Sequence, residues 1–398
     1  MPDYKYIIVG GGMTADAAAG AIRELDANGS MALFTAETDP PYDRPPLSKG
    51  LWRGAPLDKI WRTSKDLELD LHLGRRIVSL DPRNKTVVDD LGTTHTFDKL
   101  LLATGGTPRQ LAFGGDSIIY FRTLADYRRL RAAADKYEHF AVIGGGFIGS
   151  EIAAALAMNG KKVTLVFPDE TIGSRIYPRD VGLFLNDYYR QKGVVVRGEE
   201  AVVGLEETNK GPVLKLQQTK TQAESSVLAD AVVAGIGILP NVDLAKAAGL
   251  ATDNGILVDR FLRTSQPDIF AAGDVARFYN PALDRQIRLE HKDCAISTGR
   301  TAGQAMAGQP SEYNILPFFY SDLFELEYDA VGELDSRLQT VADWKEQYSE
   351  GVIYYLRDQR VCGVLLWNVW GQVDAARSLI AEPGPFTAAD LKGRLPAA

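Results

Sequence analysis

Two glycine-rich turns hold the residues of this chain whose types and spacing best suit cofactor chemistry. In such a turn the first glycine lets the chain leave a strand sharply, and the second lets the backbone approach a pyrophosphate. A small third residue lets the following helix pack closely on the strand, and the helix N-terminus offers its free N–H groups to the phosphates. These positions are Gly10, Gly12 and Ala15 in the first turn and Gly144, Gly146 and Gly149 in the second.

Each turn is followed, at the spacing of a dinucleotide site, by an acid that can accept ribose hydroxyl groups. Glu37 lies 22 residues after Ala15, and Asp169 lies 20 residues after Gly149. One such motif is often only a tight turn, but two copies with two acids predict two dinucleotide sites.

The acid of the second site also bears on coenzyme choice. A 2′-phosphate 4 Å from Asp169 would be repelled by up to about 4 kcal/mol at an effective dielectric of 20. Arg175 and Arg179 are near enough in sequence to soften this repulsion. If the coenzyme of this site is a nicotinamide dinucleotide, we therefore expect NADH to be preferred to NADPH.

The elements around the turns are strand, helix and strand in both cases. The first copy is a strand over Tyr4–Val9, a helix reaching Leu25 and a strand over Met31–Thr35. The second is a strand over 140–143, a helix over 150–158 and a strand over 163–167. We also expect a hairpin around Asp89–Gly92, a separate strand over 99–103 and a helix over 292–306.

After Pro310 the pattern changes to short β runs and a closing helix over 369–381, which indicates a separate α+β domain. The predicted fold is α/β, with two Rossmann-like dinucleotide-binding domains and this C-terminal domain. The first dinucleotide-binding domain is expected to be discontinuous, over 1–115 and 249–315. The second is placed at 116–248, and the C-terminal interface domain at 316–398.

Composition excludes several classes of protein. The 398 residues have a net charge of −8, which argues against a basic surface that binds nucleic acid. We see no signal peptide and no apolar run long enough for a membrane span, so the expected location is the cytoplasm. Cys294 and Cys362 are the two cysteines, and no ligand cluster supports a metal site. Disulfide reductase chemistry needs a redox-active cysteine beside its cofactor, and no cysteine occurs before Cys294.

Further motifs lie along the chain at Pro41–Lys49, Ala103–Gly105, Gly144–Glu151, Ala272–Asp274, Arg288–Asp293, Tyr320–Leu323, Gly351–Asp358 and Leu366–Asn368. Together with the first turn and Glu37, they resemble the two-dinucleotide flavoprotein reductases. That superfamily includes ferredoxin reductases, disulfide reductases and apoptosis-inducing factor. The local match is closest to apoptosis-inducing factor, and it covers nearly the whole chain. The chain has no long insertion between Trp344 and Gly351 and no basic composition, and we expect no organelle-targeting leader, so apoptotic DNA binding is not implied.

The resemblance implies that the first turn binds FAD and the second binds NADH. It places Gly10, Gly12 and Ala15 on the FAD pyrophosphate and Glu37 on the adenosine ribose. Asp274 would accept a hydroxyl of the ribitol chain, although a turn acid is the alternative. The other implied FAD contacts are Arg44, Thr104, Gly105, Glu290 and His291.

The catalytic residues implied by the resemblance are Lys49, Glu151 and His291. Lys49 would lie near flavin N5 and pair with Glu151, so that its cation stabilises the reduced flavin. The residue type alone favours a solvated surface lysine. His291 begins a helix whose N-terminus points at the flavin pyrimidine edge, which indicates packing or electrostatics rather than acid–base catalysis.

On the nicotinamide side, Phe147 resembles the aromatic residue that covers the flavin until nicotinamide displaces it. Ordinary core packing explains Phe147 equally well. Tyr320 stands where the family has a tryptophan near the nicotinamide. The other implied contacts are Arg122, Gly144, Gly146, Ile148, Gly149, Glu151, Asp169, Arg175 and Gly237.

Three functions are open at this point. The first is an FAD-dependent NADH oxidoreductase similar to apoptosis-inducing factor, with hydride passing from NADH to flavin N5 and electrons leaving to an unknown acceptor. Ferredoxin, a quinone or oxygen are the acceptor classes considered, and the resemblance also implies a stable charge-transfer complex and a redox-linked homodimer. The second is a ferredoxin or rubredoxin reductase serving an oxygenase or P450. The third is an NADH-sensing interaction protein with little turnover.

Overall fold

The computed structural model describes residues 3–63 and 67–395, and its chain forms two compact units. Unit 1 comprises Met1–Arg44, Leu57–Thr107 and Leu239–Pro317, whereas unit 2 comprises Pro45–Pro56, Pro108–Ile238 and Phe318–Ala398. The three-part division expected from the sequence stays a prediction, and its residues 1–2, 64–66 and 396–398 lie outside the described part. Within the described ranges, no helix combines the length and the apolar character that a membrane crossing requires.

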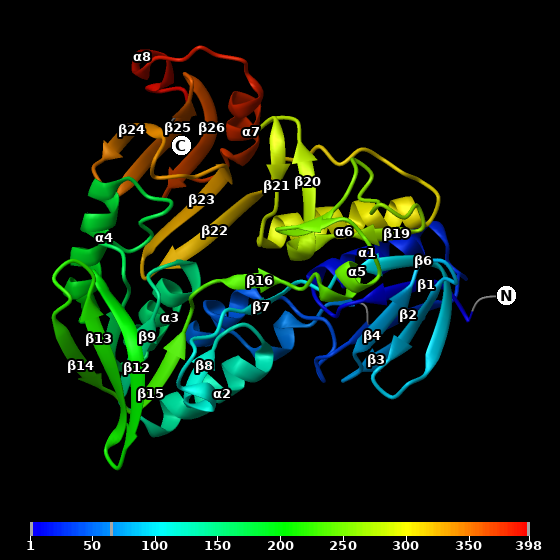
Figure 1. Cartoon of the computed structure of the whole chain (residues 1–398). Coiled ribbons are helices and arrows are strands. Elements are labelled where there is room, and N and C mark those ends of the chain that lie inside the picture. Colours follow the sequence, from blue (N-terminus) through cyan, green and yellow to red (C-terminus); the bar gives the residue numbers. More distant parts are fainter. Residues whose placement is uncertain (1–2, 64–66, 396–398) are drawn as a thin grey trace. The chain divides into compact units, whose positions relative to one another are not determined.

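The core of unit 1 is a sheet built around β1 (Tyr4–Val9), which pairs in parallel with β2 (Met31–Thr35) and with β6 (Thr94–Leu102). Residues 6–9 are buried and mostly apolar, as expected for a parallel strand covered on both faces. The strand order is β3-β2-β1-β6-β5-β4, and β19 pairs with β6 (Figure 1). The remaining strands of this sheet are β3 (Asp70–Leu73), β4 (Ile77–Asp81), β5 (Thr86–Asp89) and β19 (Ile269–Ala271).

The strand β6 differs from the sequence prediction of two separate strands. Its first half pairs antiparallel with β5, which confirms the hairpin, and its second half pairs in parallel with β1 and β19. Asp98, the exposed residue between the two predicted strands, lies inside one continuous strand. A polar residue on the outward side does not end a strand when its neighbours remain paired.

Two helices of unit 1, α1 (Met13–Leu25) and α6 (Lys292–Met306), pack together through small residues. A Cβ on Gly299 would lie 2.4 Å from the carbonyl oxygen of Thr14, and one on Gly303 would lie 2.4 Å from that of Ala18. The helices therefore approach with backbones in contact, and α6 has the predicted bounds. The smaller elements of unit 1 are α5 (Asp243–Ala247), β17 (Thr252–Asp253), β18 (Gly255–Leu257), β20 (Ala276–Asn280) and β21 (Arg285–Ile287).

Unit 2 contains a second parallel sheet, in the order β11-β10-β9-β15-β8. The helix α3 (Phe147–Met158) joins β9 to β10, which repeats the topology of the first turn. This helix begins three residues before the predicted start. The other elements are β8 (Ile118–Tyr120), α2 (Leu124–Lys136), β9 (His139–Ile143), β10 (Lys162–Val166), α4 (Arg179–Gln191), β11 (Val195–Arg197) and β15 (Ala231–Ala234).

Two antiparallel sheets complete unit 2. One has the order β12-β13-β14, and the other has the order β22-β23-β26-β25-β24. The edge strand β22 (Phe318–Leu323) was not predicted, because Tyr320-Ser321-Asp322 interrupts its apolar pattern. The other elements are β12 (Glu200–Thr208), β13 (Gly211–Gln218), β14 (Glu224–Leu228), β23 (Leu326–Gly332), β24 (Gln339–Glu346), β25 (Glu350–Arg357), β26 (Arg360–Trp367), α7 (Val373–Ala381) and α8 (Ala388–Leu391). Two short strands, β7 (Gly106–Pro108) and β16 (Ile238–Pro240), contain points where the chain passes from one unit to the other.

Candidate dinucleotide and redox sites

The first glycine-rich turn joins β1 to α1. Gly10 has a φ of +122°, and a Cβ there would lie 2.1 Å from the carbonyl oxygen of Ala103, so only glycine fits. Gly12 is the N-cap of α1 in extended conformation, and the nearest protein atom to a Cβ there is an Arg44 nitrogen at 4.0 Å. No neighbouring protein atom excludes a side chain at Gly12. The glycine therefore leaves open space at a helix N-terminus, and this space suits a pyrophosphate. Ala15 is fully buried in α1.

The second turn repeats this arrangement between β9 and α3. Gly144 has a φ of +113°, and its Cβ would lie 2.4 Å from the carbonyl oxygen of Gly235. A Cβ on Gly149 would lie 1.8 Å from the carbonyl oxygen of Gly144, so helix and turn are in backbone contact. A Cβ on Gly146, the N-cap of α3, meets nothing within 4 Å. Each unit thus carries one dinucleotide cradle with a space at the position of the second glycine.

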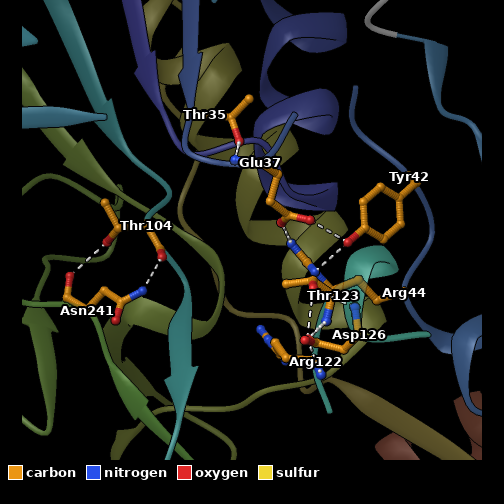
Figure 2. A network of polar contacts seen from close by, with 9 residues as sticks. All are labelled: Thr35, Glu37, Tyr42, Arg44, Thr104, Arg122, Thr123, Asp126 and Asn241. Atoms are coloured by element: carbon orange, nitrogen blue, oxygen red, sulfur yellow. Dashed lines mark hydrogen bonds and ion pairs between the residues drawn. The ribbon is translucent and has the colours of Figure 1, made fainter. Parts of the chain in front are cut away.

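Glu37, at the end of β2, is held by two partners. The Tyr42 hydroxyl donates to its carboxylate at 2.5 Å, and the Arg44 guanidinium forms an ion pair with it (Figure 2). Burial disfavours the charge of Arg44, but Tyr42, Glu37 and Asp274 outweigh that cost and raise the pKa of Arg44. The carboxylate is therefore oriented and balanced, as a ribose-binding acid should be. The structure places Arg44 on Glu37 and within 4.0 Å of the open position at Gly12.

Asp169 is exposed after β10. Arg179, expected to soften its charge, instead makes a bidentate ion pair with Glu170, at 2.8 and 2.5 Å. Arg175 is exposed, and its backbone carbonyl accepts a hydrogen bond from Ser336. Arg179 is thus paired with Glu170, and it would offset a repulsion between Asp169 and a 2′-phosphate less than the sequence suggested.

Replacing Asp169 with alanine should reduce the preference for NADH over NADPH by at least about tenfold. The reason is the loss of a charge repulsion that reaches about 4 kcal/mol at close range. The ratio of kcat/KM for the two coenzymes measures this, with Glu206→Ala as the control, because Glu206 is an exposed acid of the same unit that pairs with Lys215. An unchanged ratio would remove Asp169 from coenzyme selection.

Two hydrogen bonds between Thr104 and Asn241 fix the loop after β6. The Thr104 hydroxyl donates to the Asn241 carbonyl at 2.8 Å, and the Asn241 side-chain amide donates to the Thr104 carbonyl at 2.8 Å (Figure 2). Gly105 follows with a φ of +63°. Asn241 was not singled out from the sequence, although it holds the predicted contact residue Thr104 in place.

The second cluster of unit 1 comprises Asp274, Arg288, Glu290 and His291. Asp274 follows β19 in a short 3-10 turn, and its backbone carbonyl accepts from Arg288 at 3.0 Å. Arg288 also pairs with Glu290 at 2.8 Å, so Glu290 is joined to Asp274 through one guanidinium. His291 is the N-cap of α6. Burial lowers the pKa of His291 to about 4 against the opposing effect of Asp274, so the ring is neutral at pH 7. This supports packing or electrostatics over acid–base catalysis for His291.

The lowered pKa of His291 predicts a loss of stability in acid. In the unfolded chain the imidazole binds a proton below about pH 6.5, but in the folded chain only below about pH 4. The folded state therefore loses stability as pH falls through this window, by up to about 3 kcal/mol for a shift of this size. His291→Gln should flatten the pH dependence of urea unfolding between pH 6.5 and 4.5. Equal slopes for the variant and the parent protein would contradict this.

Lys49 and Glu151 meet inside unit 2. The Lys49 ammonium lies 2.5 Å from Oε1 of Glu151, and their side chains are 10% and 3% exposed. The ammonium also lies 5.3 Å from the ring centroid of Tyr320, on β22. The residue type alone favoured a solvated lysine for Lys49, but the structure shows a buried, paired cation. An ammonium so placed can stabilise negative charge on an adjacent electron-rich ring.

Two serines also donate hydrogen bonds to Glu151, and neither was predicted from the sequence. Ser48 donates to Oε2 at 2.6 Å, and Ser321 donates to Oε1 at 2.5 Å. Both stand inside motifs already noted, directly beside Lys49 and Tyr320. The signal that could have identified the two serines is their position in the sequence, because each is adjacent to a predicted site residue.

The other predicted nicotinamide-side residues are spread over unit 2. Phe147 is the first residue of α3, and its ring packs edge-on against Phe319 at 5.1 Å, while Ile148 is 37% exposed. Arg122 precedes α2, and its backbone N–H bonds to Asp126 within the capping network (Figure 2). Gly237 has a φ of +90°, and its carbonyl accepts from the Arg109 amide.

The two cysteines are buried and unpaired with each other. Burial raises the pKa of the Cys294 thiol, which keeps it protonated and unreactive. Over residues 3–63 and 67–395, no group of three His, Cys, Asp or Glu side chains is arranged to hold a metal ion.

Comparisons with known proteins agree with this arrangement. Residues 4–299 match the family model described as pyridine nucleotide-disulphide oxidoreductase, and residues 342–382 match the C-terminal domain of mitochondrion-associated apoptosis-inducing factor. The ferredoxin–NAD(+) reductase component of the anthranilate 1,2-dioxygenase system of Burkholderia cepacia is 35% identical, over 97% of each chain. Apoptosis-inducing factor 1 of Dictyostelium discoideum is 32% identical, over 95% of this chain and 78% of that protein. The reductase in the putidaredoxin reductase–putidaredoxin complex superposes with a TM-score of 0.89 at 28% identity, covering 97% of this chain and 94% of that one.

These matches confirm the α/β fold with its two Rossmann-like parts and its C-terminal domain. They also confirm the resemblance to apoptosis-inducing factor and ferredoxin reductases. The two cradles fit one dinucleotide each. The chain therefore belongs to the pyridine nucleotide-disulphide oxidoreductase family, in which it is an FAD-dependent NAD(P)H oxidoreductase that binds FAD and NADH.

Proposed function

We propose that this chain transfers electrons from NADH, through FAD, to a small iron–sulfur protein of the ferredoxin type. The observation that carries the proposal is end-to-end correspondence with reductases of that kind. The Burkholderia component aligns over 97% of both chains, whereas the Dictyostelium apoptosis-inducing factor has about a fifth of its length unmatched. The solved structure that superposes at a TM-score of 0.89 is itself a complex of a reductase with putidaredoxin.

The proposed roles of the residues rest on the resemblance, and the observed geometry supports them. When bound, FAD accepts a hydride from NADH and passes electrons onward to an acceptor. The turn at Gly10–Ala15, with Glu37 and Arg44, would hold FAD, and the turn at Gly144–Gly149, with Asp169, would hold NADH. The buried Lys49–Glu151 pair would supply a fixed positive charge to the reduced ring. Asp274 and His291 would line the FAD site, with His291 neutral.

A second candidate function is an NADH sensor similar to apoptosis-inducing factor, with little turnover. The observation that favours it is the match of residues 342–382 to the C-terminal domain of that family. Under this proposal the protein would form a homodimer on reduction. The cytoplasm is the proposed compartment for either function.

The test is NADH oxidation measured with and without an added acceptor. We expect putidaredoxin or a similar [2Fe–2S] ferredoxin to raise NADH-dependent cytochrome c reduction by at least about tenfold over the protein alone. Rubredoxin serves as a second acceptor, because it carries no [2Fe–2S] cluster.

A failure of every iron–sulfur acceptor to stimulate turnover would overturn the electron-transfer proposal. A long-wavelength absorbance band that survives air for minutes, together with a shift to dimer in size-exclusion chromatography with NADH, would then favour the sensor.

A further inference from the structure

The Glu151 carboxylate receives three hydrogen bonds inside unit 2. Its Oε1 accepts from the Lys49 ammonium and from the Ser321 hydroxyl, both at 2.5 Å, and its Oε2 accepts from the Ser48 hydroxyl at 2.6 Å. Ser48 is 5% exposed and Ser321 is 1% exposed, so water does not replace these bonds readily. A carboxylate oxygen accepts hydrogen bonds, and three donors hold this carboxylate in one orientation.

The donors come from separate chain segments. Ser48 and Lys49 are consecutive and follow the short 3-10 turn Pro45–Leu47, whereas Ser321 lies in the edge strand β22. Ser48 and Lys49 contact different oxygens, so one short segment holds both oxygens of the carboxylate. Ser321 adds a donor from a separate strand, and it shares Oε1 with the ammonium.

We propose that Ser321 is a positioning residue of the redox site, which acts on Lys49 through Glu151. The hydrogen bond from its hydroxyl offsets part of the negative charge on Oε1. The carboxylate then neutralises the Lys49 ammonium less fully, and more of the positive charge remains available to an electron-rich ring. The same hydrogen bond also prevents the carboxylate from turning away from Lys49. This inference rests on the proposed function, in which Lys49 acts on the reduced flavin. It makes an edge strand of the C-terminal sheet part of the redox machinery.

The test is Ser321→Ala. At saturating NADH we expect the rate of flavin reduction in stopped-flow absorbance to fall about tenfold, with KM for NADH within about twofold of the parent. The two-electron flavin potential should become more negative by about 30 mV, which corresponds to a tenfold change in the equilibrium. Ser321→Thr keeps the hydroxyl and should restore both quantities. A merely structural role would lower stability without moving the potential.

The matched control is Ser225→Ala, because the Ser225 hydroxyl also donates to a glutamate, Glu200, in the same unit. It should change neither rate nor potential. If Ser321→Ala does not fold, Ser321→Cys keeps the volume with a weaker donor and should show the same changes in smaller degree. Folded variants with the parent rate and potential would overturn the role of Ser321. A parent protein that NADH does not reduce would instead overturn the proposed function.

Discussion

Lys49→Met should lower the rate of flavin reduction by NADH about 100-fold while leaving FAD bound. The substitution removes a buried cation, and removing one charge-stabilising group from a preorganised site costs about 100- to 1,000-fold in rate. Lys49 is only 10% exposed and its ammonium lies 2.5 Å from Glu151, so water cannot substitute for its charge. The measurement is single-turnover flavin reduction under anaerobic conditions at saturating NADH.

A matched control exists in the same unit. Lys161 is 15% exposed and pairs with Glu138 at 3.0 Å, so Lys161→Met removes a similar pair elsewhere. It should leave the rate unchanged. Because Lys49 and Glu151 act as one unit, the double variant Lys49→Met with Glu151→Gln should be no slower than Lys49→Met alone. A Lys49→Met protein that retains FAD and the parent rate would remove Lys49 from the chemistry.

Alanine at Gly144 and at Gly146 should separate folding from coenzyme binding. Gly144 has a positive φ, and its Cβ would lie 2.4 Å from a backbone oxygen, so Gly144→Ala should destabilise the fold by at least about 2 kcal/mol. Gly146 has extended backbone and open space around a Cβ. Gly146→Ala should cost no more than about 1 kcal/mol as a changed N-cap.

The same Gly146→Ala variant should bind NADH about 100-fold more weakly, because the new methyl group stands where the pyrophosphate would approach. That factor corresponds to about 2.7 kcal/mol of binding free energy. Thermal unfolding and NADH titration of the two variants measure both effects, and FAD content is the internal control. If Gly146→Ala binds NADH like the parent, the second turn does not hold a pyrophosphate.

The sequence predicted the parts of this molecule that depend on local pattern. The strands and helices next to the glycine-rich turns could be predicted because a positive φ, an N-cap and a buried apolar run all act within a few residues. The contact between Lys49 and Glu151 was available only through resemblance, since nothing local relates two residues 102 positions apart. Ser321 was missed for the same reason. Its polar neighbours concealed the strand β22 as well, and a strand supported by pairing to β23 tolerates such an interruption.

The distance in sequence between the partners of Glu151 has a consequence for biosynthesis. Lys49 lies 102 residues before Glu151, and Ser321 lies 170 residues after it. At about 5 to 20 residues per second, roughly 10 to 30 s pass on the ribosome between the synthesis of Glu151 and that of Ser321. During that interval α3 can form while its carboxylate lacks the donor from β22. A nascent or truncated chain that ends before Ser321 can thus contain both glycine-rich turns and still lack the complete Lys49–Glu151 cluster. The segment without any dinucleotide motif is the one whose emergence completes this cluster.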